Sequence, residues 1–191
     1  MTSQNTQKRG TLFVMSAPSG AGKSTLKDRM IEKVPGLRYS ISCTTRNPRV
    51  GEIDGVHYFF KTKEEFLQMI AKNELVEHME VHGNYYGTPK FFIEDCLSAG
   101  QSIVFDLDVY GKINFDKIFP DAIGILILCP SFEELERRIR YRATDSEEVI
   151  QLRMKNARDE VAFAQTQGKY EHTLINDDLE RATAELLALM S

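Results

Sequence analysis

The sequence predicts an α/β fold in which helices cover both faces of a doubly wound parallel sheet. Short apolar stretches alternate with segments of helical periodicity along most of the chain. The stretches around Leu12, Ile103 and Ile125 are apolar without the alternation of a half-exposed strand, which is typical of central strands in such a sheet. A glycine-rich turn joins the first of these stretches to the first helical segment. Together these observations favour layers of helix, sheet and helix around one core.

The composition fits one globular domain of 191 residues. Hydrophobic residues make up 42% and charged residues 27%, values that exclude a disordered or collagen-like chain. The formal net charge is −4, whereas general nucleic-acid or membrane-surface binders are usually basic. We therefore expect neither nucleic acid nor membrane as a partner, although a few local arginines could still hold a small anion.

Cysteine usage and the N-terminus indicate a cytoplasmic protein. The three cysteines lie far apart and form no CxxC pair, so a disulfide framework or a structural zinc site is not expected. Residues 1–10 lack an apolar signal core, and the longest apolar run covers only 122–129. A membrane span needs about 20 apolar residues, so this run predicts a buried strand.

The elements follow in order from periodicity and turn residues. We expect strands over 11–16, 39–43, 56–60 and 75–81, and helices over 23–33 and after a capping box formed by Thr62 and Glu65. Gly83-Asn84 is predicted to be a turn, and Thr88-Pro89 to be the N-cap and first residue of another helix. The C-terminal half predicts strands over 102–107, 122–129 and 173–175, and helices over 109–119, 133–141, 147–164 and about 179–190. The segment 39–88 has shorter, more polar strands, so we interpret it as an inserted and largely antiparallel lobe.

The turn after the first strand carries the strongest motif. It closely matches the phosphate-loop pattern GxxxxGK[ST] of P-loop nucleotide-binding proteins, with alanine at the first glycine position. Glycines let successive backbone N–H groups face one anion, and the following helix start adds its positive dipole end. A lysine in this position bridges the β- and γ-phosphates, and a serine holds Mg²⁺. The predicted ATP-binding residues here are Ala17, Pro18, Ser19, Gly20, Ala21, Gly22, Lys23, Ser24 and Thr25. The alternative is a glycine-rich turn that only opens a helix.

A carboxylate is predicted at the same edge of the sheet. Asp106 ends the strand at 102–106, and the carboxyl ends of parallel strands meet at the edge where the phosphate loop lies. Asp106 and Ser24 are therefore the candidates to hold Mg²⁺ or its water shell. The alternative for Asp106 is a helix cap at the strand end.

The inserted lobe carries a second anion-binding candidate. Arg46 and Arg49 lie three residues apart around a proline, and arginine side chains bind phosphate through two donors at once. Tyr85 and Tyr86 supply phenols that can donate to the same phosphate. Two loop arginines taken alone are more often solvated than functional.

Several ordered segments, spread from about residue 10 to 190, resemble the guanylate kinase family. They are SAPSGAGKST, SISCTTRNPRVGE, VHYFF, VHGNYYGT, FDLDVYG, RRIRYRATDSEE and INDDL. The resemblance implies a phosphoryl transfer from ATP to GMP with Mg²⁺. It also implies a P-loop core at about 10–38, 89–137 and 154–191, a GMP-binding lobe at about 39–88 and a helical lid at about 138–153.

The resemblance implies two sets of GMP-binding residues. The GMP phosphate would be held by Arg46, Arg49, Tyr58 and Tyr86, and the guanine by Ser42, Glu77, Thr88 and Asp108. Guanine presents adjacent N1–H and N2–H donors that one carboxylate accepts side by side, whereas adenine has no donor at N1. A hydrogen-bonding site of this kind rejects such an analogue by up to about 10⁴–10⁵-fold. The alternative is that Glu77 is a solvated strand residue and Thr88 only a helix cap.

The resemblance also implies catalytic arginines and an adenine neighbour. Arg138, Arg142 and Arg153 would close over the transferring phosphoryl group, and Asn176 would lie near the adenine of ATP. With Lys23 and Arg46, these arginines would offset the charge of a loose transition state. The alternative is a solvated basic helix face.

Two other functions remain open from the sequence. One is a related P-loop kinase that acts on another phosphorylated acceptor. The other is a catalytically silent guanylate-kinase-like binding module, although Lys23 and Ser24 are both present. The chain also departs from the usual family pattern at Cys43, Tyr110 and Ala143. We expect a monomer or small homo-oligomer.

Overall fold

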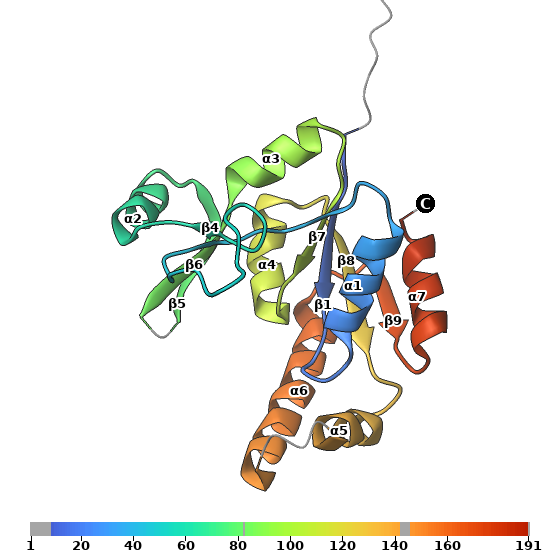
Figure 1. The fold of residues 1–191 in the computed structure, drawn as a ribbon. Coiled ribbons are helices and arrows are strands. Elements are labelled where there is room, and N and C mark those ends of the chain that lie inside the picture. Colours follow the sequence, from blue (N-terminus) through green and yellow to red (C-terminus); the bar gives the residue numbers. More distant parts are fainter. Residues whose placement is uncertain (1–8, 82, 142–145, 191) are drawn as a thin grey trace, which may run out of the picture. The chain divides into compact units, whose positions relative to one another are not determined.

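The computed structural model describes residues 9–81, 83–141 and 146–190 (Figure 1). Its contacts divide the chain into two compact units. The nucleotide unit, as we name it, comprises residues 12–37 and 104–191, and the lobe unit comprises the chain up to residue 11 together with 38–103.

The main sheet has five strands in the order β2-β7-β1-β8-β9. They are β1 (Leu12–Ser16), β2 (Arg38–Tyr39), β7 (Ile103–Asp106), β8 (Ile123–Leu128) and β9 (His172–Ile175). β1 pairs in parallel with β8, and β8 pairs in parallel with β9. All five residues of β1 are buried, as the unbroken apolar stretch predicts for a central strand.

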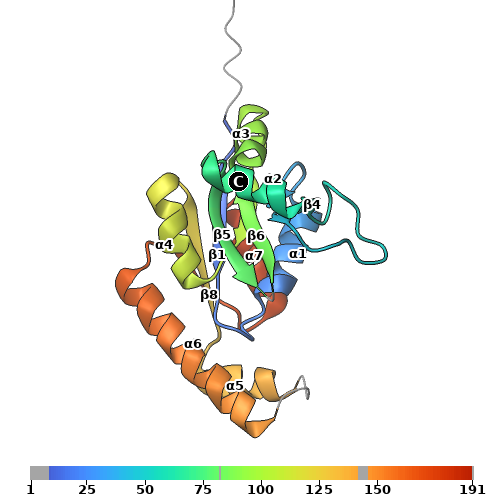
Figure 2. The same cartoon turned by 90° about the vertical axis from the view of Figure 1, so that its left-hand side faces the viewer.

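The described part of the nucleotide unit contributes five helices. They are α1 (Lys23–Lys33), α4 (Val109–Ile118), α5 (Phe132–Tyr141), α6 (Glu147–Gln167) and α7 (Leu179–Ala188). Figures 1 and 2 show α1 beside α7 on one face and α4 with α6 on the other, so the sheet is doubly wound as predicted. The core between them includes Met15, Leu26 and Met30, all with no exposed surface. None of the helices in the described part of the chain combines the length and apolar character that crossing a membrane requires.

The lobe unit contains a second sheet in the order β4-β3-β6-β5. Its strands are β3 (Cys43–Thr44), β4 (Phe59–Phe60), β5 (Leu75–Val81) and β6 (Asn84–Pro89), and its helices are α2 (Lys63–Ala71) and α3 (Lys90–Ser98). β6 is antiparallel to both β5 and β3, while β3 and β4 are parallel. The prediction of a largely antiparallel lobe sheet is therefore confirmed, with one parallel pair.

The predicted capping box of α2 is present. The backbone N–H of Glu65 donates to Thr62 Oγ1 at 3.1 Å, and the backbone N–H of Thr62 donates to Glu65 Oε2 at 2.7 Å. α2 then buries Phe66 and Met69 against Cys43 and Leu75 of the sheet.

Three predicted elements of the lobe were wrong in detail. The expected strand at 39–43 is two short strands in different sheets, because the chain passes from one sheet to the other there. The expected strand at 56–60 is reduced to Phe59–Phe60, because the backbone N–H groups of Val56 and His57 turn back to the carbonyl of Ile53. Gly83 lies in the predicted turn, with a φ of 76°, but Asn84 already belongs to β6. β6 continues to Pro89, and Pro89, not Thr88, is the N-cap of α3.

Candidate active site

The phosphate loop lies between the buried strand β1 and the helix α1, as the sequence predicts. Gly20 has a φ of 100° and Gly22 a φ of 92°, backbone conformations that side chains other than glycine rarely adopt. A Cβ at Gly20 would also lie 2.9 Å from Ile139 of α5, so the loop and α5 are closely packed. All predicted loop residues from Ala17 to Thr25 except Ala21 line a cavity of about 300 Å³, whose size and backbone N–H groups suit an anion.

Lys23 connects the loop to the end of β7. Its ammonium forms an ion pair with Asp106 and donates to the backbone oxygen of Leu107 at 3.3 Å. The two predicted residues are thus brought together. The helix cap that was the alternative role for Asp106 is supplied instead by Asp108, whose Oδ1 accepts from the backbone N–H of Gly111 at 2.6 Å.

The oxygen donors at this edge fit a hard divalent cation. Ser24 lies in the first turn of α1 and lines the phosphate cavity, and the Asp106 carboxylate is fixed beside Lys23. Across the described residues no group of three or more His, Cys, Asp or Glu side chains could hold a metal ion by itself. Mg²⁺ is usually bound by one or two protein oxygens together with substrate phosphates, and the donors here match that pattern.

A carboxylate that the sequence analysis missed also lines the phosphate cavity. Glu160 on α6 is half-buried there. Burial raises its pKa above the ordinary value, the nearby Asp108 carboxylate adds to the rise, and Lys23 opposes it. The sequence offers no signal for this role, because α6 carries several other acidic residues and only the fold brings Glu160 to the cavity.

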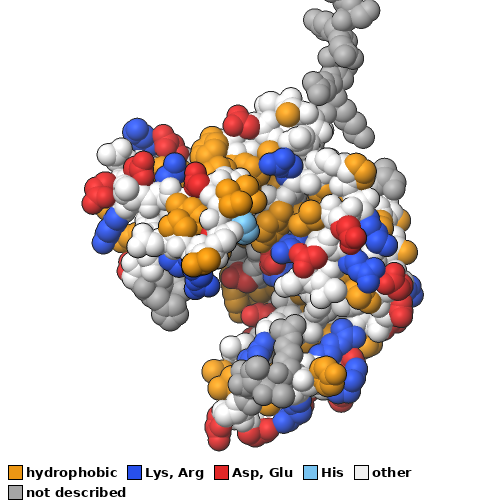
Figure 3. Space-filling model, in the orientation of Figure 1, with side chains coloured by type: hydrophobic (Ala, Val, Ile, Leu, Met, Phe, Trp, Pro, Cys, Tyr) orange, Lys and Arg blue, Asp and Glu red, His pale blue; other side chains and the backbone are white. Residues whose placement is uncertain are grey.

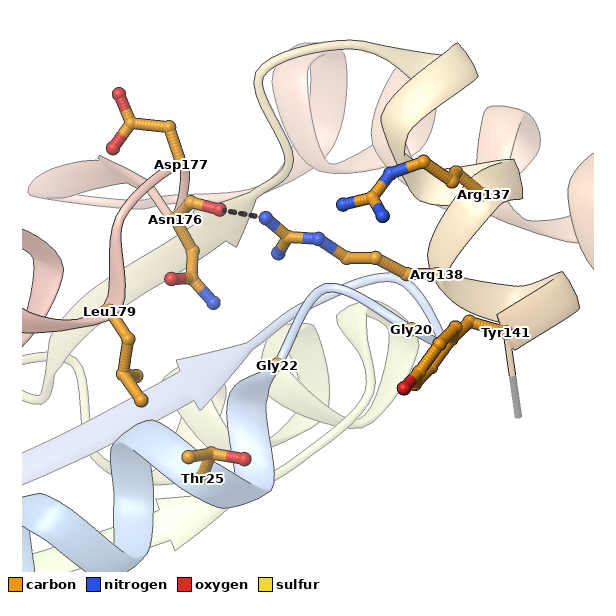
Figure 4. A pocket seen from close by; sticks show the side chains of 9 residues that line it. All are labelled: Gly20, Gly22, Thr25, Arg137, Arg138, Tyr141, Asn176, Asp177 and Leu179. Carbon is orange, nitrogen blue, oxygen red and sulfur yellow. Dashed lines mark hydrogen bonds between the residues drawn. The ribbon is translucent and has the colours of Figure 1, made fainter.

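A second cavity, of about 450 Å³, adjoins the loop through Gly20, Gly22 and Thr25 (Figure 4). The buried Asn176 donates from Nδ2 to the backbone oxygen of Ala21 at 2.8 Å, which ties the end of β9 to the loop. This cavity joins residues of the loop with residues that follow β9 and residues of α5. It is lined by Gly20, Gly22, Thr25, Arg137, Arg138, Tyr141, Asn176, Asp177 and Leu179.

Two of the predicted arginines are placed near the loop. Arg138 donates to the backbone oxygen of Asn176 at 2.8 Å and to Glu134 at 2.7 Å. Arg153 on α6 donates to Ser19 Oγ at 2.7 Å. The third, Arg142, lies outside the described residues, as does Ala143, and so does part of the predicted lid.

The lobe unit holds a cluster around Arg46. This guanidinium pairs with Glu52 at 2.8 Å and lies 5.4 Å from the centre of the Tyr58 ring. Tyr58 in turn is in edge contact with Tyr86 at a centroid distance of 6.2 Å. Three of the four predicted phosphate ligands are thus together, while the exposed Arg49 contributes a backbone N–H to Glu52 at 2.7 Å.

Glu52 was not assigned a role from the sequence. Its pKa is held at about 2, first by the hydrogen bond from Arg46 and then by the backbone N–H of Arg49. The carboxylate therefore stays charged and orients Arg46 at neutral pH. The pairing depends on the conformation of the 47–55 loop, which residue spacing alone does not define.

The predicted guanine residues of the lobe unit are partly assembled. The buried Thr88 donates from its hydroxyl to Glu77 Oε1 at 2.7 Å. Thr88 lies two residues from Tyr86 on β6, so both side chains share one face of the sheet. Ser42 precedes β3 and accepts through its backbone oxygen from the N–H of Phe59 at 2.9 Å. Asp108 belongs to the nucleotide unit.

The face of the molecule in Figure 3 bears charged side chains of both signs. Among its described residues no continuous basic surface is visible, which agrees with the net charge of −4. Lys23, Arg46 and Arg138 each pair with a carboxylate, respectively Asp106, Glu52 and Glu134.

The doubly wound sheet, the left-handed glycines of the loop and the Lys23–Asp106 pair define a P-loop nucleotide-binding protein. A profile described as guanylate kinase matches residues 9–191. A guanylate kinase from Caldanaerobacter subterraneus is 45% identical, with 96% of this chain and 88% of the relative covered. One from Desulfitobacterium hafniense is 40% identical, with 96% and 90% covered. The crystal structure of a guanylate kinase from Anaplasma phagocytophilum superposes with a TM-score of 0.67 at 30% identity, covering 96% of this chain and 85% of that one. The chain belongs to the guanylate kinase family.

Proposed function

We propose that the chain is an ATP:GMP phosphotransferase, which moves the γ-phosphoryl group of ATP to GMP and releases ADP and GDP. The observation that carries this proposal is the phosphate loop with its Lys23–Asp106 pair, in a chain that matches the family over residues 9–191. Nothing in the described residues favours another acceptor or a silent binding module.

ATP is assigned to the two adjoining cavities of the nucleotide unit. The triphosphate binds the N–H groups of the loop from Ala17 to Thr25, and Lys23 leaves Asp106 to bridge the β- and γ-phosphates. The adenine occupies the larger cavity beside Asn176. Mg²⁺, held by Ser24 and Asp106 together with the phosphates, would supply charge neutralisation and geometry for the phosphates.

GMP is assigned to the proposed lobe at 39–88. Its phosphate binds Arg46, Arg49, Tyr58 and Tyr86, and its guanine binds Ser42, Glu77, Thr88 and, from the nucleotide unit, Asp108. Thr88 already donates to one oxygen of Glu77, and this hydrogen bond fixes the orientation of the carboxylate toward the base. The adjacent N1–H and N2–H donors of guanine suit that carboxylate, whereas adenine would leave it unpaired.

The chemistry requires positioning and positive charge rather than a general base. An ionised oxygen of the GMP phosphate attacks the γ-phosphorus, the bond to the bridging oxygen of ADP breaks, and ADP leaves with that electron pair. Lys23, Arg138 and Arg153 balance the negative charge on the donor side, and we assign the same role to Arg142 in the proposed lid at 138–153. Exclusion of water prevents hydrolysis of ATP. We place the reaction in the cytoplasm and expect a monomer or small homo-oligomer.

The Lys23→Ala variant tests this assignment. We expect GMP-dependent ADP release to be nearly abolished, while the far-UV circular dichroism spectrum stays that of the parent. Lys33→Ala, an exposed change in the last turn of the same helix, is the matched control and keeps parental turnover. If the Lys23→Ala variant kept parental turnover, the phosphate-loop assignment would be wrong.

A further inference from the structure

Tyr141 is a large aromatic side chain that the packing of the nucleotide unit does not use. It is 86% exposed at the end of α5, and within the described residues it has no ring partner and no hydrogen bond. The core side of α5 is formed by Leu135 and Ile139 instead. Tyr141 follows Ile139 by two residues, which places it about 200° around the helix from the core side.

The position of Tyr141 is set by the phosphate loop. Leu135 and Ile139 lie so close to Gly20 that a Cβ there would be 3.1 Å and 2.9 Å away from them, respectively. Because this contact fixes α5 against the loop, Tyr141 is held at the edge of the 450 Å³ cavity beside Gly20 (Figure 4). Leu179 lies across the cavity from it, so the cavity has an aromatic wall and an aliphatic wall.

The charges around this cavity favour a neutral, planar occupant near Tyr141. Arg137 donates to Glu134 through two nitrogens at 2.7 Å and 2.8 Å, and Arg138 binds the same carboxylate. These arginines hold the pKa of Glu134 at about 2, with Arg137 as the larger cause. Glu134 thus offsets part of the positive charge of Arg137 and Arg138 in this wall of the cavity. The exposed ring of Tyr141 beside them presents a flat, largely apolar surface.

We propose that Tyr141 stacks on the purine base of the donor nucleotide. The inference rests on the proposed function, because a nucleotide whose phosphates occupy the loop has its base in the adjoining cavity. An aromatic side chain stacks on a base through its π-face, and loss of such a stack weakens binding by roughly 5- to 150-fold. Tyr141 is therefore a donor-binding residue that acts at the base rather than at the phosphates.

Steady-state kinetics test the contact. Tyr141→Ala raises the KM for ATP at least fivefold and leaves the KM for GMP within twofold, because only the donor base loses its partner. Tyr141→Phe restores the KM for ATP to within about twofold of the parent, since the phenyl ring keeps the stack. Ile118→Ala, an exposed change in the last turn of α4 away from both cavities, is the matched control. An unchanged KM for ATP in Tyr141→Ala, or an equal rise in both KM values, overturns the proposal.

A fluorescence experiment separates stacking from phosphate binding. The chain contains no tryptophan, so Tyr141→Trp creates a single reporter at the cavity. We expect ADP to quench its emission and tripolyphosphate, which lacks a base, not to quench it. The Ile118→Trp protein, whose reporter lies on α4 away from both cavities, responds to neither. Absence of quenching by ADP, or equal quenching by tripolyphosphate, contradicts stacking.

The two experiments also keep this inference distinguishable from the proposed function. Quenching by ADP in a protein without GMP-dependent turnover would remove the GMP assignment and leave the stack. Full GMP-dependent turnover without quenching would remove the stack alone.

Discussion

The Asn176→Ala variant tests how the phosphate loop keeps its shape. Asn176 is 5% exposed, and its amide donates to the backbone oxygen of the buried Ala21 at 2.8 Å. Its own backbone N–H donates to the carbonyl of Leu128 at 2.8 Å, and its carbonyl accepts from Arg138. The substitution removes only the side-chain amide and leaves those two backbone contacts in place.

The expected loss can be estimated from burial. A buried carbonyl that loses its hydrogen-bond donor costs roughly 1–3 kcal/mol. With a urea m-value of about 2 kcal/mol per M, the unfolding midpoint should fall by about 0.5–1.5 M. The loop would also be less well ordered for the phosphates, so ADP should bind more weakly than to the parent.

Urea unfolding followed by circular dichroism, together with calorimetric titration of ADP, measures both effects. Glu180→Ala removes an exposed pair with Arg29 on the neighbouring helix and is the control, with an expected midpoint close to the parent's. A midpoint and an ADP affinity both equal to the parent's would refute the role of Asn176 as a support of the loop.

Three further predictions concern the lobe unit and the thiols. Glu77→Ala should raise the KM for GMP and reduce the preference for GMP over AMP, measured by ADP release with each acceptor; unchanged selectivity would remove Glu77 from the guanine site. The pKa of Glu52 is lowered to about 2 by Arg46, so its contribution to stability is complete above about pH 4.5 and is lost as the pH falls toward 2. The difference in Tm between the parent and Glu52→Gln should therefore shrink over that interval in a thermal melt, and a constant difference would contradict the pairing. Burial raises the pKa of the Cys43 thiol to about 11 and also raises the pKa values of the Cys96 and Cys129 thiols. Because the thiolate is the reactive form, Ellman's reagent at pH 8 should modify the native protein slowly. After unfolding in guanidinium, all three thiols should react rapidly, and rapid reaction of the native protein would contradict their burial.

Local patterns predicted the elements of the nucleotide unit well. β1 and α1 follow from an apolar run, a glycine-rich turn and helical spacing, and α1 has the predicted bounds of Lys23–Lys33. α5 and α6 differ from the prediction by one to three residues at one end each. These elements are specified by signals that lie within the segments themselves.

The elements of the lobe unit were harder to predict because their pairing is not local. β6 contains Gly87 and Pro89, which favour turns, yet its ladder with β5 makes it a strand. The segment 39–43 was predicted as one strand, but β2 and β3 at its two ends belong to different sheets. Such choices depend on partners far along the chain.

In the site, too, the residues that belong to a local motif were predictable, whereas contacts between distant parts of the chain were not. The phosphate loop and Asp106 were recognisable from a motif and a strand end, and the structure places Asp106 beside the loop, where it forms an ion pair with Lys23 that was not predicted. Asn176 was expected only near adenine, because its hydrogen bond to Ala21 spans 155 residues. The roles assigned to individual ATP and GMP ligands stay predictions.

The central claim is that the protein transfers the γ-phosphoryl group of ATP to GMP. The most direct test measures ADP release from Mg-ATP by the purified protein in the presence of GMP, AMP, CMP, UMP or no acceptor. The account predicts strong stimulation by GMP and none by the other acceptors, because only guanine offers the paired donors that Glu77 accepts. Stimulation by another acceptor, or by none of them while ADP still binds, would contradict the assignment of the lobe as a GMP site.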